Sequence, residues 1–208
     1  MTKSTQPKST TRYIDTALSV LSRSEVIPLE REGVKKAQQF IIKLSGTQAA
    51  ITPRLILDVH RVGFGFIFPK WAGKFRTIDV TVGEYEPPHY SRIPELIQNL
   101  CNDLAERLHQ LPSPKNEEIF LAEVISLLAW FQHQFVWIHP FKDYNGRVAR
   151  LLTNLLAINI GLPILTIKAE TGRDRERYIK ALKASDKQDY HKLEKLIANA
   201  LKESFEKV

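Results

Sequence analysis

Twelve residues from His139 to Arg150 constrain this chain more than any other stretch, and they read His-Pro-Phe-Lys-Asp-Tyr-Asn-Gly-Arg-Val-Ala-Arg. An apolar run with helical spacing follows at once, formed by Leu151, Leu152, Leu155, Leu156 and Ile158. The polar residues are therefore expected on a turn that opens a buried helix. The first backbone N–H groups of a helix have no internal partner and carry partial positive charge, so such a turn is suited to bind an anion.

Two residues of this stretch suit proton transfer and metal binding. His139 is a candidate general base, because imidazole is the side chain whose unperturbed pKa lies nearest neutrality. Asp143 is a candidate Mg²⁺ ligand, because Mg²⁺ commonly takes one or two protein carboxylates together with substrate phosphates. Each feature alone has an ordinary explanation, since a histidine beside an aromatic-rich helix is more often a packed core residue.

The following residues suit phosphate. Asn145 and Gly146 allow the backbone to turn with converging N–H groups, as in an anion nest. Arg147 and Arg150 are three residues apart, so a helix places them on one face, where two guanidinium groups suit a polyphosphate. In this fixed order, the stretch predicts phosphate-ester chemistry on a nucleotide, with a hydroxyl nucleophile activated by His139.

Outside this stretch the chain predicts a mostly α-helical domain. Apolar spacing predicts helices over residues 13–21, 29–44, 52–66, 94–108, 117–136, the motif helix to about 159, 171–184 and 190–205. Pro28 is expected to separate the first two helices and Gly46 to end the second, while Thr52-Pro53 is typical of a helix start. The most apolar helix, over residues 117–136, is expected at the centre of the core.

One strand signal stands out, the alternating β-branched stretch 74–83, which Gly73 and Gly83 bracket. It predicts a β-hairpin or extended flap.

The length of 208 residues fits one domain, and the net charge of +7 favours anionic partners. The single Cys101 excludes an internal disulfide and a cysteine-based zinc site. Without an apolar run of about 18 residues or a signal-like N-terminus, we expect a cytoplasmic protein with no membrane span, although secretion without a cleaved signal stays open.

The central stretch resembles the Fic (Fido) motif, His-Pro-Phe-x-Asp/Glu-Gly-Asn-Gly-Arg-x-x-Arg, and matches every specified position except one. The resemblance extends through Ala72-Gly73-Lys74-Phe75-Arg76, Val80-Thr81-Val82-Gly83, Pro87-Pro88, Arg177-Tyr178, Ala181-Leu182 and Asp186. It implies a mostly α Fic-type helical bundle with one β-hairpin flap. The implied organisation is a flexible tail at residues 1–12, N-terminal helices packed on the core at 13–51, and the Fic domain at 52–208.

Members of this family transfer AMP from ATP to a hydroxyl of a target protein. The resemblance therefore implies a protein adenylyltransferase with ATP as substrate, Mg²⁺ as cofactor and a Tyr, Thr or Ser hydroxyl as acceptor. His139 would deprotonate that hydroxyl, and Asp143 would bind Mg²⁺. The implied nucleotide-binding residues are Asp143, Tyr144, Asn145, Gly146, Arg147 and Arg150 around the phosphates. Three more, Tyr178, Ile179 and Asp186, would line the pocket for the nucleobase. The flap Val80, Thr81, Val82 and Gly83 would align the target by main-chain pairing.

Tyr144 departs from the pattern, because the family usually has glycine there. If the position needs a positive φ, tyrosine costs about 1 kcal/mol or more. If the backbone is ordinary, the ring would lie at the mouth of the site. Two alternatives stay open: a Fic enzyme with another donor such as UTP or GTP, and a degenerate non-catalytic module that binds nucleotide or a partner. No helix-turn-helix or basic-aromatic pattern predicts a nucleic-acid partner.

Many Fic proteins are inhibited by a helix with the pattern Ser/Thr-x-x-x-Glu-Gly/Asn. The glutamate of this helix forms an ion pair with the second arginine of the motif. Glu32-Gly33 has Pro28 in place of the hydroxyl residue, and the Glu170 of Thr166-x-x-x-Glu170 is followed by Thr171. Neither is a clean match. We therefore expect either a separate inhibitory partner or oligomer, or no restraint of this kind.

Overall fold

The computed structural model describes residues 3–4, 14–45, 47 and 49–206, and these are mostly helical. The helices are α1 (Arg23–Ser45), α2 (Pro53–Phe64), α3 (Ile93–His109), α4 (Glu117–Ile138), α5 (Asn145–Asn159), α6 (Gly172–Ser185) and α7 (His191–Phe205). A short 3₁₀ turn, Tyr90–Arg92, precedes α3. The strands are β1 (Lys3–Ser4), β2 (Ile14–Asp15), β3 (Val20–Leu21) and β4 (Val80–Thr81). The predicted fold class, a helical bundle with a small β flap, is confirmed.

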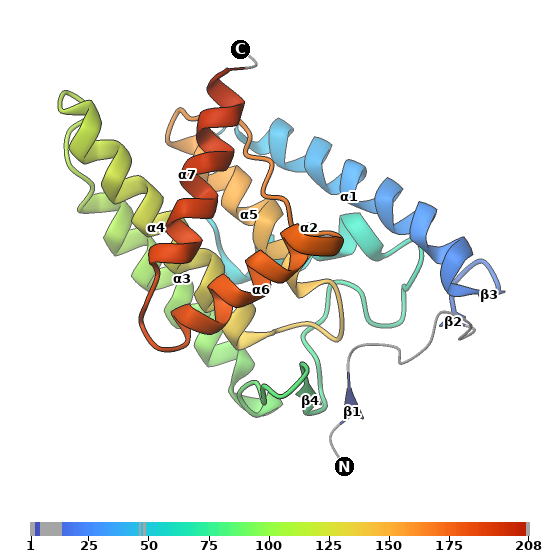
Figure 1. Cartoon of the computed structure of the whole chain (residues 1–208). Coiled ribbons are helices and arrows are strands. Elements are labelled where there is room, and N and C mark those ends of the chain that lie inside the picture. The colour runs from blue at the N-terminus through green and yellow to red at the C-terminus, as the bar shows by residue number, and fades with distance from the viewer. Residues whose placement is uncertain (1–2, 5–13, 46, 48, 207–208) are drawn as a thin grey trace.

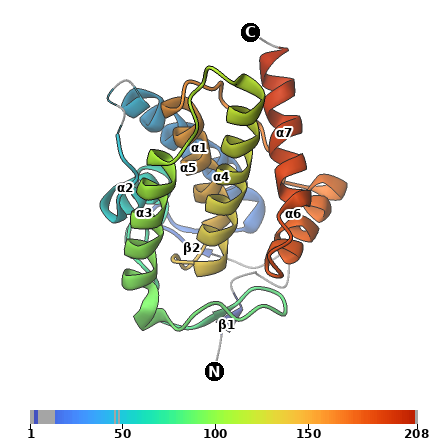
Figure 2. The same cartoon turned by 90° about the vertical axis from the view of Figure 1, so that its left-hand side faces the viewer.

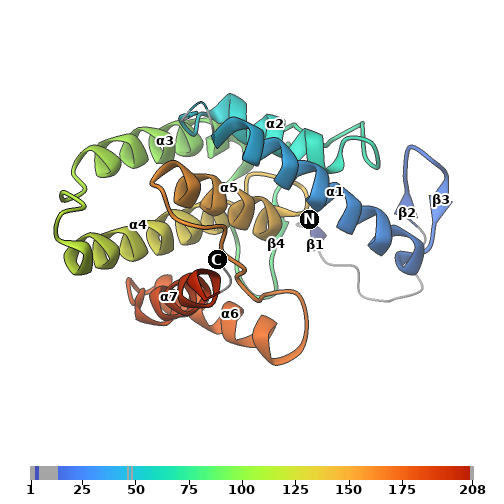
Figure 3. The same cartoon turned by 90° about the horizontal axis from the view of Figure 1, so that it is seen from above.

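The helix α4 is the centre of the bundle and packs against α3, α5 and α7 (Figures 1 and 2). Beyond α5 lie α1 and α2, and on the other side of α4 lie α6 and α7 (Figure 3). By length and composition α4 could cross a membrane, but its central position explains the same apolar character. Its fully buried residues include Val124, Leu128, Phe131 and Phe135. Because α4 and α5 are both core helices, the loop between them is held rigidly at both ends.

The helix predicted over residues 13–21 is wrong, because this segment forms an antiparallel hairpin. The strand β2 pairs with β3, with Ile14 opposite Leu21 and Asp15 opposite Val20. The Thr16 hydroxyl group directs the turn: it donates to the carbonyl oxygen of Ser19 at 2.6 Å and accepts from the N–H groups of Leu18 and Ser19. Local side-chain bonds of this kind compete with helix formation.

The break predicted at Pro28 is also wrong, since α1 runs through this residue. The helix starts earlier because Glu25 caps it, accepting from the backbone N–H of Ser22 at 2.8 Å and from its hydroxyl group at 2.6 Å. Pro28 lies in the second turn, where it removes one backbone hydrogen bond. The predicted end at Gly46, and residues 1–2 and 5–12 of the predicted tail, lie outside the described residues.

The flap is shorter than the predicted strand over 74–83. Its regular part is β4, and a tight turn follows in which Val82 and Tyr85 exchange backbone hydrogen bonds of 2.9 and 3.1 Å. Gly83 has φ +64°, a conformation that favours glycine. The strand β1 pairs in parallel with β4, with Lys3 opposite Val80 and Ser4 opposite Thr81 (Figure 1). The edge of the flap thus accepts an added strand.

Candidate active site

His139 lies directly after α4, where the backbone enters the left-handed region with φ 51°. Its Nδ1 is 3.3 Å from the carbonyl oxygen of Val136, a contact that places the proton on Nδ1 and leaves the lone pair on Nε2. The residue is 8% exposed. Burial lowers the pKa of His139 to about 4, and the nearby Arg76 charge acts in the same direction. The imidazole is therefore neutral at pH 7 and able to accept a proton.

Arg76 connects the motif loop to the flap. Its Nε donates to the carbonyl oxygen of His139 at 2.9 Å, and its backbone N–H donates to that of Pro140 at 2.9 Å. The guanidinium group also donates to the carbonyl oxygens of Ile78 and Pro88, near the two ends of the flap. The sequence does not reveal this anchor, because nothing about an isolated arginine between β-type residues indicates that its side chain will be buried, as it is here at 4% exposure.

The side chain of Asn145 closes the loop on itself. Its Oδ1 accepts from the N–H of Phe141 at 2.8 Å, and its Nδ2 donates to the carbonyl oxygen of Phe141 at 2.9 Å. The residue is 2% exposed. The Phe141 ring in turn stacks on His60, with ring centroids 3.8 Å apart. The Asn145 amide therefore shapes the turn, which leaves the backbone of residues 145–146 as the group that would meet a phosphate.

Asp143 lies on the same loop and is partly buried. Its Oδ1 accepts from the N–H of Tyr144 at 2.6 Å, and its backbone oxygen is 3.3 Å from Nε2 of His60. Burial raises the pKa of Asp143 to about 6. Among the described residues no three His, Cys, Asp or Glu side chains gather to hold an ion by themselves. A single carboxylate of this kind would fit Mg²⁺ if a phosphate were bound beside it, because Mg²⁺ commonly takes its remaining ligands from substrate and water.

Tyr144 has φ 65°, so the position does use the left-handed region that glycine normally occupies. Its ring is not at the mouth of the site. It stacks on Phe64 of α2 with ring centroids 3.9 Å apart, and its hydroxyl group donates to Oε1 of Glu30 in α1 at 2.8 Å. At 7% exposure this ring cannot stack on a nucleobase without moving. Its side chain instead ties the motif loop to α1 and α2.

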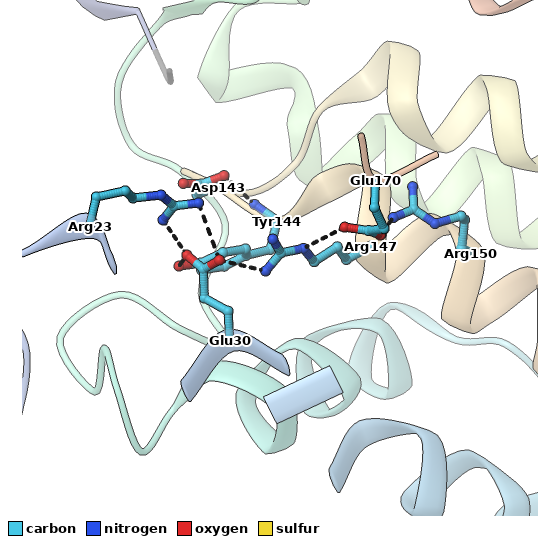
Figure 4. A network of polar contacts seen from close by, with 7 residues as sticks. All are labelled: Arg23, Glu30, Asp143, Tyr144, Arg147, Arg150 and Glu170. Carbon is cyan, nitrogen blue, oxygen red and sulfur yellow. Dashed lines mark hydrogen bonds and ion pairs between the residues drawn. The ribbon is translucent and has the colours of Figure 1, made fainter. Parts of the chain in front are cut away.

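Both motif arginines already contact carboxylates (Figure 4). A row of alternating charges runs from Arg23 through Glu30, Arg147 and Glu170 to Arg150. Arg147 donates to Oε2 of Glu30 at 2.9 Å, and its Nε is 3.9 Å from Oε2 of Glu170. Arg150 donates to the other oxygen of Glu170. The two arginines therefore converge on one carboxylate, which indicates that they can converge on a phosphate.

Two members of this row, Arg23 and Glu30, were not predicted. They come from α1, and the spacing of charges along that helix does not reveal which residues face inward. Glu32, the α1 glutamate that partly fits the inhibitory pattern, is half-exposed and pairs with Lys36 at 2.8 Å. Gly33 beside it serves packing, because a Cβ there would lie 2.0 Å from the carbonyl oxygen of Gly63 in α2.

The residues predicted to surround the nucleobase lie on and after α6. Tyr178 is buried, and the guanidinium group of Arg150 lies over its ring at 5.6 Å from the centroid. Ile179 is half-buried. Oδ1 of Asp186 lies within hydrogen-bonding distance, 2.9 Å, of Nε2 of His133 in α4. The structure thus brings Tyr178 to Arg150 and holds Asp186 against α4.

The predicted flap residues lie beside the end of α4. Val80 is buried, and the hydroxyl group of Tyr85 donates to the carbonyl oxygen of Trp137 at 2.9 Å. Trp137 is two residues before His139, so the flap is attached next to the candidate base. Together with the Arg76 contacts, this places the flap edge, Val80 to Gly83, alongside the motif loop.

Comparison with known proteins gives a family and two sets of relatives. A model of the Fic/DOC family matches residues 50–157. Protein adenylyltransferase Fic of Nematostella vectensis is 32% identical over 161 residues, which are 77% of this chain and 34% of that protein. The protein of the same name from Aedes aegypti is 29% identical over 191 residues, 91% of this chain and 36% of that protein. The chain spans about a third of the length of these relatives.

Solved structures share the fold. A fragment of Fic-1 from C. elegans superposes with a TM-score of 0.63 at 26% identity, covering 84% of this chain and 48% of that chain. BepC of Bartonella tribocorum, solved with bound AMPPNP, superposes with a TM-score of 0.70 at 16% identity, covering 93% and 94%. The second likeness concerns the fold alone. Because the family model matches just over half of the 208 residues, this chain belongs to the Fic/DOC family.

Proposed function

We propose that this chain is an ATP- and Mg²⁺-dependent protein adenylyltransferase that modifies a Tyr, Thr or Ser hydroxyl of a target protein. One observation carries this assignment: His139 lies at the start of the same short loop that leads to Arg147 and Arg150 in the first turns of α5. A base beside a paired cation site suits nucleotidyl transfer to a hydroxyl group. The relatives named protein adenylyltransferase support the same reaction class.

In the proposed reaction the target hydroxyl oxygen attacks the α-phosphorus of ATP. The bond from that phosphorus to the bridging oxygen of the β-phosphate breaks, and pyrophosphate leaves. Nε2 of His139 accepts the hydroxyl proton. Arg147, Arg150 and the N-terminal N–H groups of α5 would stabilise the negative charge of the phosphates. Asp143 would hold Mg²⁺, which supplies further charge neutralisation when bound.

The flap is proposed to align the target. An extended target segment would take the place of β1 at the edge of β4. Main-chain hydrogen bonds would then position the segment whatever its sequence, and side-chain contacts would select it. Because Arg76 attaches the flap to the backbone of His139 and Pro140, a segment on this edge would be held at a fixed position relative to the base.

The test is a donor panel. The protein is incubated with a cell lysate and Mg²⁺ in the presence of α-labelled ATP, UTP or GTP, or of γ-labelled ATP. We expect protein labelling from α-labelled ATP, no labelling from γ-labelled ATP, and loss of labelling when EDTA removes Mg²⁺. Stronger labelling from UTP or GTP would indicate the alternative donor. Nucleotide binding with no transfer from any donor would indicate a non-catalytic module.

Glu170 is expected to compete with the phosphates. Replacing Glu170 with glutamine removes the negative charge from Arg147 and Arg150 without shortening the side chain. The side chain is 63% exposed, so its ion pairs are worth about 1 kcal/mol at most, and we expect up to about a fivefold lower Kd for ATP. Titration with a fluorescent ATP analogue measures this change.

The matched control for this change is Glu203→Gln. Glu203 forms an exposed ion pair with Lys168 at 2.8 Å, outside the row of motif arginines. Its replacement should leave the Kd unchanged. An unchanged or higher Kd in Glu170→Gln would show that this carboxylate does not occupy the phosphate position.

A further inference from the structure

We propose that Glu30 is a positioning residue for Arg147, so that α1 forms part of the nucleotide site. This inference rests on the proposed function, because it assigns Arg147 to the phosphates. Glu30 is 0% exposed and lies 117 residues before Arg147 in the chain. A carboxylate buried this completely needs partners for its charge and for its lone pairs.

The Glu30 carboxylate has four donors, which is about its full capacity. Its Oε1 accepts from Arg23 and from the hydroxyl group of Tyr144 at 2.8 Å. Its Oε2 accepts from Arg23 at 3.2 Å and from Arg147 at 2.9 Å. Each oxygen therefore receives one bond from Arg23 and one from the motif loop or α5. The carboxylate is held from three elements, and it holds Arg147 in return.

The charges of this cluster favour a supporting role over a blocking one. Arg23 makes a two-pronged contact with Glu30, so one positive charge balances the buried negative charge. The charge of Arg147 is then not needed to balance Glu30, and it faces Asp143, the exposed Glu170 and any anionic ligand. One terminal nitrogen of Arg147 donates to Glu30, whereas the Nε of Arg147 faces Glu170. A planar guanidinium group fixed at one corner presents its other N–H groups in a set direction.

Glu30 and Glu170 should therefore act in opposite senses. Glu170 is mostly exposed and contacts both motif arginines, as a phosphate would. Glu30 is fully buried and, of the two motif arginines, contacts Arg147 alone. Arg23 and Tyr144 also donate hydrogen bonds to its carboxylate. Removing the charge of Glu170 should tighten nucleotide binding, and removing that of Glu30 should weaken it.

The experiment compares Glu30→Gln with Glu32→Gln, a change on the same helix whose carboxylate pairs with Lys36 at the surface. For each variant we would measure the Kd for a fluorescent ATP analogue, the KM for ATP and the KM for the labelled target, at a temperature where circular dichroism shows both to be folded. We expect Glu30→Gln to raise the Kd and the KM for ATP about tenfold, with the KM for the target unchanged. Glu32→Gln should match the wild type.

Several outcomes would overturn this assignment. An unchanged or tighter nucleotide affinity in Glu30→Gln would show that Glu30 does not position Arg147, and higher transfer activity would show that it restrains the site. An equal rise in the KM for ATP and for the target would indicate a purely structural role. A wild type that binds nucleotide but transfers nothing refutes the proposed function alone, because the Kd comparison still decides the role of Glu30. A wild type without nucleotide binding refutes both.

Discussion

Replacing His139 with asparagine or alanine is expected to lower AMP transfer by about 10²–10⁴-fold, which is the usual contribution of a general base. Burial keeps the imidazole neutral, and its Nδ1 contact with the carbonyl oxygen of Val136 leaves the lone pair on Nε2. Asparagine is the better probe, because it tolerates the left-handed backbone that this residue adopts at φ 51°. Initial rates of transfer from α-labelled ATP measure the loss.

Measuring the Kd for ATP distinguishes a variant that has lost only the general base from one that has lost its fold. The Kd for ATP should stay within about twofold of the wild type in His139→Asn, because the arginines remain in place. His191→Asn is the matched control, since His191 lies on the surface of α7, and its rate should be unchanged. Equal labelling by wild type and His139→Asn would refute the assignment of His139 as the base.

The same substitution has a consequence for stability. The pKa of His139 is about 4 in the fold and near 6.5 in the unfolded chain, so the unfolded state binds more protons between these values. Stability contributed by the neutral imidazole is therefore present above pH 6.5 and is lost as the pH falls toward 4. His139→Asn removes this group, so its unfolding free energy should fall less steeply than that of the wild type over this range.

Replacing Gly33 with alanine is expected to destabilise the fold by about 3 kcal/mol. The added Cβ would lie 2.0 Å from the carbonyl oxygen of Gly63 and 3.1 Å from its carbonyl carbon, so α1 and α2 would have to separate. At an open helix position the same change would stabilise by about 1 kcal/mol, which makes the sign of the effect informative. Urea denaturation, followed by circular dichroism, gives the free energy of unfolding.

Gly63→Ala is the matched control within the same contact. Its nearest neighbour would be the Cβ of Ala37 at 3.4 Å, so we expect a much smaller change in stability. Because Gly33 is about one turn after Glu30, separation of the helices should also draw Glu30 away from Arg147 and weaken ATP binding. A Gly33→Ala protein as stable as the wild type would show that the two helices are not in close contact.

Several elements could be predicted because short-range chemistry decides them. The Thr52 hydroxyl group accepts from the N–H of Leu55 at 3.1 Å and starts α2, as the Thr-Pro pair predicts. The apolar spacing after the motif predicts α5, which ends shortly before Gly161, where φ is +90°. The expected position of His139 at the end of a buried helix is likewise confirmed.

The errors also have local causes. The segment from Ile14 to Leu21 has helical apolar spacing, but its side-chain bonds at Thr16 favour a turn, and a stretch this short has too few positions to separate the two patterns. The break at Pro28 was wrong because a proline near the start of a long helix costs one hydrogen bond, which the packing of the remaining turns outweighs.

By itself, the sequence determined the candidate functional groups of this protein: a histidine, an acidic residue and two arginines whose order and spacing along residues 139–150 do not depend on the rest of the fold. Only the tertiary structure decided what surrounds them. The direction of the Tyr144 ring, the pairing of Arg147 with Glu30 and the position of Glu170 across both arginines join segments that are 20 to 117 residues apart. The physical reason is that motif spacing is set by the local backbone, whereas the partners of a charge are set by which helices pack together.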